Sequence, residues 1–284
     1  MSLSALHRAL FRCTNRLSPS SEPYLSGDTF RAMSNHVLDA RSKIDPSRVC
    51  FGDIVFVSLT HISFFFKEVH PKIHGKYIFV THNGDLTITP AHLRYLDAKI
   101  IYWFSQNVNV KHTKILPIPI GLENFSYYNH GIPKLFSDIS YTPPEQKKPR
   151  ILHGFSTSTN PKIREKAKKV LSQLKTSDEI GSRLISPDYM RVLETYMFVA
   201  SPPGNGLDSH RTWEALYVKT IPIVLRSVAM EYFAQHGLPI YIIDNWSDLK
   251  TLSESDLRDI YMTKVKLFQS PALWFDFWKN KIKK

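Results

Sequence analysis

The stretch that decides the fold is SPPGNGLDSHRTWEALYVKTIPIVLRS, residues 201–227. It follows an apolar run at 196–200 that predicts a buried strand, and it ends in a second apolar run at 221–225. Between the two runs lie a proline- and glycine-rich turn and a helix that we expect to begin after Asp208 or Ser209, both favourable N-cap residues. A strand, a turn, a helix and a second strand predict an α/β fold with a parallel sheet.

The start of this helix has the chemistry of an anion site. The first backbone N–H groups of a helix have no intrahelical partner, and the helix dipole places partial positive charge there. Arg211 lies in the first turn, where its guanidinium can hold two phosphate oxygens, and the Glu214 carboxylate can accept hydrogen bonds from ribose hydroxyls. The alternatives are a surface salt bridge and a plain glycine turn. We expect nucleotide contacts from Gly204, Asn205, Gly206, Asp208, Ser209, His210, Arg211 and Glu214.

This segment resembles the donor-binding signature of exostosin-related glycosyltransferases, and most closely that of the ribitol xylosyltransferase branch. The likeness is strong over about 27 of the 284 residues and weaker over 117–124 and 150–164. The family usually has glycine where this chain has Lys219. The shared elements are Gly204-Asn205-Gly206, His210-Arg211, Trp213, Glu214-Ala215-Leu216 and Ile221-Pro222-Ile223-Val224.

The resemblance implies a GT-B architecture, in which two Rossmann-like αβα domains face each other across a cleft. The second domain would hold the donor and the first domain mainly the acceptor, and the last helix would cross back onto the first domain. Residues 141–150, YTPPEQKKPR, have the composition of an exposed linker with nothing apolar enough to pack inside. We therefore expect an acceptor-side domain at 1–145 and a nucleotide-sugar-binding domain at 146–284.

The apolar runs and helical stretches alternate along the chain as βα units do. Strands are expected at 53–58, 76–80, 99–104, 115–120, 151–153, 196–200, 221–225 and 240–244. Helices are expected at 61–73, 90–98, 161–174, 189–194 and 253–268, with the signature helix between them.

Two further segments carry candidate chemistry. The hydroxyl-rich turn at 154–160 precedes a basic helix, so Ser156 and Arg164 could contact phosphate, although such turns also cap helices without a ligand. An inverting transfer requires a base near the acceptor hydroxyl, and the sequence THNGD at 81–85 places Asp85, or else His82, after a strand. The alternative for this segment is an ordinary Asx turn.

The metal-binding motifs that such enzymes often use are not evident. The chain has no Asp-x-Asp sequence and no His/Cys cluster with ligand spacing. Arginine and helix N–H groups can neutralise a diphosphate in place of a divalent ion. We therefore expect a metal-independent enzyme without a cofactor, whose donor substrate is a UDP-sugar or a GDP-sugar.

The composition limits the kinds of partner that this protein is expected to have. The formal charge is +12, which favours anionic partners, and basic residues exceed acidic ones equally in the two halves, so we expect no nucleic-acid partner. The two cysteines, Cys13 and Cys50, have no CxxC spacing, and no apolar run is long enough for a membrane span. We expect a cytoplasmic protein. The basic segment 1–21 leaves open a transit peptide or a contact with an anionic membrane surface. The aromatic, basic tail 271–284 leaves open a similar membrane contact.

Taken together, these features favour an inverting glycosyltransferase that moves a sugar from a nucleotide diphosphate sugar to a glycan or another hydroxyl acceptor. Three alternatives stay open from the sequence. One is a fucosyltransferase-like enzyme that uses a GDP-sugar, and another is a catalytically silent nucleotide- or sugar-binding module. The third is an αβα protein whose signature is only a convergent turn and cap.

Overall fold

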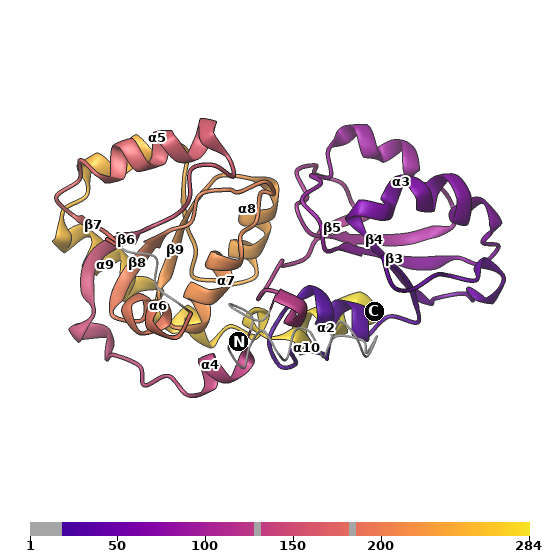
Figure 1. Ribbon diagram of the computed structural model, residues 1–284, viewed down its shortest axis with the longest axis horizontal. Coiled ribbons are helices and arrows are strands. Elements are labelled where there is room, and N and C mark those ends of the chain that lie inside the picture. Colours follow the sequence, from indigo (N-terminus) through magenta and orange to yellow (C-terminus); the bar gives the residue numbers. More distant parts are fainter. Residues whose placement is uncertain (1–18, 128–131, 182–185) are drawn as a thin grey trace, which may run out of the picture.

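The computed structural model describes residues 19–127, 132–181 and 186–284. Two lobes lie side by side, each built on a parallel five-stranded sheet with flanking helices (Figure 1). The predicted α/β class with two Rossmann-like αβα units is thereby confirmed. The basic segment 1–21, with Cys13, lies largely outside the described residues.

The first sheet has the strand order β1-β2-β3-β4-β5. Every residue of β2 and β3 is buried, because helical segments and loops cover both faces of a parallel sheet. The strands are β1 (His36–Leu38), β2 (Ile54–Ser58), β3 (Tyr77–His82), β4 (Ile100–Ser105) and β5 (Ile115–Pro117). The α-helices before the second sheet are α2 (Gly27–Ala32), α3 (Ile62–Phe64) and α4 (Pro133–Ser137).

The second sheet has the order β10-β9-β8-β6-β7. Its strand order reverses between β6 and β8, and in open α/β sheets ligands bind outside the carboxyl ends of the strands at such a switch point. The strands are β6 (Lys148–His153), β7 (Ser177–Glu179), β8 (Tyr196–Ala200), β9 (Ile221–Leu225) and β10 (Tyr241–Ile243). The helices are α5 (Pro161–Leu171), α6 (Ser186–Leu193), α7 (His210–Tyr217), α8 (Val228–Gln235), α9 (Glu254–Lys264) and α10 (Phe275–Lys283).

Several predicted elements differ in kind or length, and the helix expected at 253–268 is α9 followed by a 3-10 helix. The helix expected at 61–73 is α3 followed by a π-helix and a 3-10 helix, and the helix expected at 90–98 is a 3-10 helix at Pro90–Tyr95. The strand expected at 115–120 ends at Pro117, because Pro117 and Pro119 have no N–H to donate to a neighbouring strand.

The expectation that nothing in 141–150 packs inside is wrong. Strand β6 already begins at Lys148, and the preceding side chain, Lys147, is buried. Its ammonium donates to the carbonyl oxygens of Glu194 and Val218, which follow α6 and α7. These carbonyls lie at the negative ends of two helix dipoles, so a buried cation is stabilised there. Burial still lowers the pKa of Lys147 to about 8.

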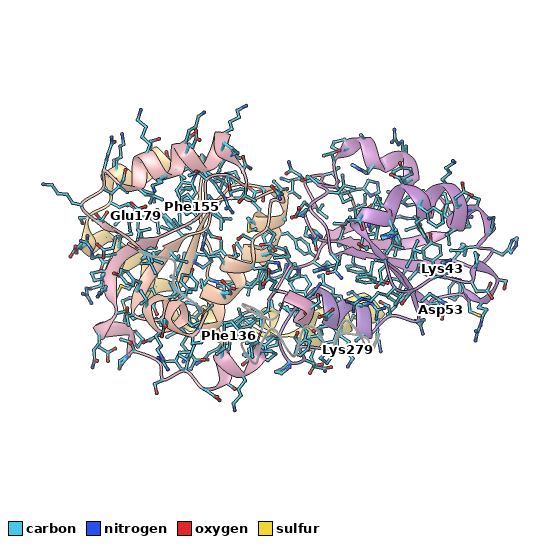
Figure 2. All side chains as sticks on the ribbon, in the orientation of Figure 1. Lys43, Asp53, Phe136, Phe155, Glu179 and Lys279 are labelled. Carbon is cyan, nitrogen blue, oxygen red and sulfur yellow. The ribbon has the colours of Figure 1, made fainter. Side chains whose placement is uncertain are left out.

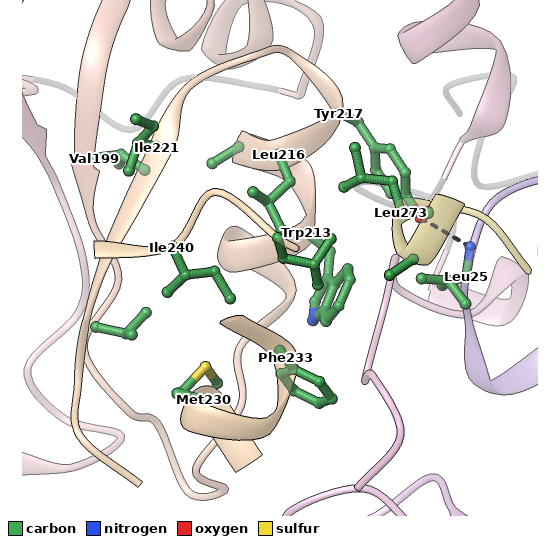
Figure 3. Close-up of a cluster of buried hydrophobic side chains, with 14 of the residues drawn as sticks. Leu25, Val199, Trp213, Leu216, Tyr217, Ile221, Met230, Phe233, Ile240 and Leu273 are labelled. Carbon is green, nitrogen blue, oxygen red and sulfur yellow. Dashed lines mark hydrogen bonds between the residues drawn. The ribbon is translucent and has the colours of Figure 1, made fainter. Parts of the chain in front are cut away.

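The lobes are joined through a continuous apolar core around α7 (Figure 3). Trp213 packs edge-on against Phe233 of the second lobe, while Tyr217 reaches the segment before α2. The Tyr217 hydroxyl accepts a hydrogen bond from the Leu25 N–H and donates to the Leu273 carbonyl, both at 3.0 Å. One buried side chain therefore links three segments that are distant in sequence.

Helix α10 lies beside α2 (Figure 1). The Phe275 N–H donates to the Pro23 carbonyl at 3.0 Å, and the Phe275 ring contacts Phe30. Phe275 and Trp278 are buried, so these tail aromatics pack within the protein and do not face a membrane surface. The domain limits 1–145 and 146–284 remain predictions. The first sheet ends at Pro117, before the boundary between them, and the second begins at Lys148, after it.

The turn between α7 and β9 keeps a left-handed backbone although it has no glycine. Lys219 has a φ of 59°, a conformation that favours glycine. The Lys219 carbonyl accepts a hydrogen bond from the buried Tyr261 hydroxyl at 2.8 Å, which helps hold the turn.

Candidate functional site

A cavity of about 850 Å³ lies between the lobes, at the carboxyl ends of β6, β7 and β8. This volume is in the range of small-molecule and cofactor sites. Phe155 and Glu179, which line it, lie near each other in the second lobe (Figure 2). Eleven of the twelve site residues predicted from the sequence line this cavity: Asp85, Ser156, Arg164, Gly204, Asn205, Gly206, Asp208, Ser209, His210, Arg211 and Glu214.

Arg211 is held at the cavity wall by its neighbours. Its Nη2 donates to the Gly154 carbonyl at 2.9 Å, and its Nε donates to the Tyr189 hydroxyl at 3.2 Å. The guanidinium also lies 5.9 Å from the centre of the Phe155 ring. These contacts fix the orientation of the planar group in the first turn of α7, where an anion would meet both the guanidinium and the positive end of the helix dipole.

Arg164 adds a second, more deeply buried cation. Its guanidinium donates to the carbonyls of Pro203 and Ser156 at 2.9 Å, and so ties together the loops that follow β6 and β8. Burial lowers its pKa, and the charge of Arg211 adds to this effect. Across the described residues, no ion pair joins either guanidinium to a carboxylate. The cavity wall therefore presents two guanidiniums that are not paired with a carboxylate, an arrangement that suits a diphosphate.

Glu214 lies on the same helix, one turn after Arg211. It is only 6% exposed, yet it lines the cavity. Burial raises the pKa of this carboxyl to about 7, an effect that Arg211 opposes and Glu123 reinforces. Near neutral pH, the group thus changes between a neutral acid and a carboxylate acceptor.

Glu214→Gln should stabilise the ligand-free protein at pH 8 and have little effect at pH 4. The unfolded carboxyl titrates near 4.5 and the folded one near 7, so the destabilising burial of its charge develops as pH rises between these values. We expect a gain of about 1–3 kcal/mol at pH 8. Urea unfolding of both proteins at the two pH values measures it, and an equal difference at both would contradict the assigned titration.

The glycine turn is closely fitted to the first lobe. A Cβ on Gly206 would lie 2.5 Å from Nδ2 of Asn107, so a larger residue cannot occupy this position without moving that side chain. Asn107 is buried, and its Oδ1 accepts a hydrogen bond from the Asp208 N–H at 3.0 Å. A Cβ on Gly204 would lie 3.1 Å from Nη2 of Arg164. Both glycines therefore serve close packing.

Asp208 joins the two lobes at the start of α7. Its carboxylate accepts hydrogen bonds from the Ile120 N–H and the Trp213 indole N–H, both at 2.9 Å. Burial raises the pKa of Asp208 to about 6 although these bonds oppose the shift. Ser209 occupies the predicted N-cap position but makes no side-chain cap bond. His210 extends the junction through its Nδ1, which lies 2.8 Å from the Gly121 carbonyl oxygen.

The two candidates for the general base, Asp85 and His82, differ in their exposure to the cavity. Asp85 is exposed at the cavity, where its Oδ2 accepts a hydrogen bond from the Asn205 side chain at 3.2 Å. His82 is 1% exposed and does not line the cavity. Its Nε2 lies 3.0 Å from the Pro119 carbonyl oxygen, and burial lowers its pKa to about 4. A neutral ring enclosed beneath the cavity is poorly placed to receive a proton from a bound acceptor.

Some lining residues were not predicted as site residues. Phe155 lies two residues after the end of β6, so its position behind a predicted strand could have indicated that it lines the cavity. Tyr189 lies on α6, and the sequence offers no indication that it contacts Arg211. Within 19–127, 132–181 and 186–284, no three His, Cys, Asp or Glu side chains are grouped closely enough to hold a metal ion. No helix of these ranges is both long and apolar enough to cross a bilayer.

Comparisons with known proteins give a distant likeness in fold. No protein-family model and no curated protein matches the sequence. Among solved structures, the chain is similar to a UDP-forming α,α-trehalose-phosphate synthase from Burkholderia vietnamiensis, with a TM-score of 0.44 and 8% identity over 85% of this chain and 71% of that one. For TarM the TM-score is 0.41 and the identity 13%, over 81% of this chain and 55% of that one.

A third similar structure is that of the spinosyn rhamnosyltransferase SpnG in complex with thymidine diphosphate. Its TM-score is 0.37 and its identity 10%, over 81% of this chain and 68% of that one. This chain thus spans about half the length of TarM and a larger share of the other two. Likeness at this level says nothing of the substrate, which must be inferred from the cavity itself.

Proposed function

We propose that the protein is an inverting, metal-independent glycosyltransferase of exostosin-like type, which uses a UDP-sugar or a GDP-sugar as donor. The observation that carries the proposal is the pair of guanidiniums, Arg164 and Arg211, at the opening of α7 beside a cavity at the sheet's switch point. Two guanidiniums without a paired carboxylate, together with the positive end of the α7 dipole, suit a diphosphate. The Glu214 carboxylate, one turn further on, would accept hydrogen bonds from the ribose hydroxyls.

In the proposed reaction, an acceptor hydroxyl attacks the anomeric carbon of the donor sugar while the bond from that carbon to the diphosphate oxygen breaks. Asp85, which the first lobe contributes to the cavity, takes the hydroxyl proton. The two guanidiniums and the α7 dipole stabilise the negative charge that develops on the departing diphosphate. The acceptor is a glycan or another molecule with a nucleophilic hydroxyl.

A panel of UDP- and GDP-sugars tests this proposal through slow hydrolysis in the absence of an acceptor. We expect release of the nucleotide from at least one donor, at a rate that EDTA leaves within about twofold, because Arg164 and Arg211 supply the positive charge. Which nucleotide is released distinguishes a UDP-sugar enzyme from the fucosyltransferase-like alternative. Tight nucleotide binding without any release would favour a silent binding module, and loss of activity in EDTA with recovery in manganese would contradict metal independence.

A further inference from the structure

A second hollow lies on the other side of α5, away from the nucleotide cavity. It has a volume of about 400 Å³ and is enclosed by α5 and by residues 244–247, which follow β10. Its floor is mainly apolar and includes Val170, Leu225 and Trp246. Helix α5 lies along the outer edge of the second lobe (Figure 1), so this hollow, here called the α5 groove, is not covered by the first lobe.

Lysines line the helical side of the α5 groove. Lys162, Lys166 and Lys169 are spaced four and three residues apart, which puts them on one side of α5. All three are exposed, and within the described chain no carboxylate pairs with them. The one acidic lining residue, Asp244, is paired with Arg226 at 2.6 Å. The rim of the groove is therefore strongly positive.

The floor contains a polar group that lacks an acceptor. Trp246 is 5% exposed, and its indole Nε1 has no hydrogen-bond partner in the described protein. A buried N–H without an acceptor carries a desolvation penalty, which an incoming oxygen atom would relieve.

These features together select one kind of occupant. One part of the occupant must carry negative charge opposite the lysines, and another part must be apolar to lie on the floor. It must also offer a carbonyl oxygen to the indole N–H. A nucleic acid fits poorly, because the Trp246 ring is too deeply buried to stack on a base. The first 18 residues of this chain contain arginines and no acidic residue, and a second copy also carries +12, so neither complements the rim.

We propose that the α5 groove binds an acidic peptide segment of a partner protein. Acidic side chains of the peptide pair with Lys162, Lys166 and Lys169, an aliphatic side chain lies on the floor, and a backbone carbonyl accepts the Trp246 N–H. The groove is formed by side chains other than those assigned to the nucleotide. The inference therefore does not depend on the proposed transferase activity.

Fluorescence anisotropy with the full chain tests the proposal. The probe is a fluorescein-labelled nonapeptide in which glutamates flank a central leucine pair, and the reference peptide has lysines in place of the glutamates. We expect the acidic peptide to bind at least tenfold more tightly than the basic one. Lys166→Glu should weaken binding at least tenfold, and Trp246→Phe, which keeps a ring but removes the N–H, should weaken it three- to tenfold.

Lys175→Glu is the matched control, because it makes the same charge change on an exposed residue that does not line the groove. It should weaken binding less than twofold. Equal losses for Lys166→Glu and Lys175→Glu would show attraction by net charge alone and would overturn the proposal. Unchanged binding of the peptide to Trp246→Phe would also overturn it. So would tighter binding of the protein to phosphatidylserine vesicles or to single-stranded DNA than to the peptide, where Lys166→Glu removes that binding.

Discussion

Arg211→Ala should weaken the binding of UDP or GDP by roughly 30-fold to 1000-fold. This range corresponds to about 2–4 kcal/mol, the usual cost of removing one partner of a buried charge-assisted pair. The side chain is held by Gly154 and Tyr189 and makes no ion pair within the described chain, so its charge is available to a phosphate. Isothermal titration calorimetry on both proteins measures the change.

The matched control is Arg191→Ala, which removes an arginine from the exposed surface of α6, where it forms an ion pair with Asp188. Nucleotide affinity should then change less than twofold, because a solvated surface charge contributes little to binding at a distance. An unchanged affinity in Arg211→Ala, with the fold intact by circular dichroism, would mean that the α7 signature is a convergent turn and cap.

Asp85→Asn should lower the turnover of a nucleotide sugar by roughly 100-fold to 10,000-fold, as expected for the loss of a general base. The amide keeps the size of the side chain and an oxygen that can still accept from Asn205, so the contact between the lobes is retained. Nucleotide affinity should stay within about twofold, because the diphosphate contacts lie on the second lobe. Initial rates and calorimetry together separate the two effects.

Two other carboxylates make this test specific. Asp259→Asn changes an exposed side chain of α9 and should leave turnover unaltered. Glu123→Gln changes the other first-lobe carboxyl that lines the cavity. If Glu123→Gln lost turnover while Asp85→Asn kept it, the base would be Glu123 and the assignment of Asp85 would be wrong.

The strands could be predicted from the sequence wherever a long apolar run is followed by residues typical of a turn. Strands β8 and β9 were predicted at their observed bounds, because each is a five-residue apolar run limited by polar or proline residues. The three-residue strands β1 and β7 were missed. β7 reads Ser-Asp-Glu, so its pairing with β6 comes from its position in the fold and leaves no apolar pattern to detect.

The candidate site was predictable where neighbours in sequence are also neighbours in space. The loop and helix at 204–214 line the cavity as expected, because a βα turn places its residues at the sheet edge. Asn107 and Tyr189 could not be found in this way, since each supports the site from a different element. The burial of His82 also depends on a distant partner, the Pro119 carbonyl. Such contacts are properties of the tertiary structure.

Lys147 shows how local composition can mislead. A proline- and lysine-rich stretch is typical of an exposed linker, and the sequence gives no reason to bury a cation in it. The folded chain brings the carbonyls that follow α6 and α7 to the same place, and their partial negative charges hold the ammonium inside. The cause of this burial lies about 50 and 70 residues along the chain, beyond the reach of any local pattern.

The most direct measurement is a crystal structure of the protein with bound UDP or GDP. If the opening of α7 holds the diphosphate, its oxygens will lie within hydrogen-bond distance of the Arg211 guanidinium and the first N–H groups of the helix, with the ribose hydroxyls at Glu214. A nucleotide bound elsewhere, or one whose diphosphate points away from Arg211 into solvent, would contradict the account.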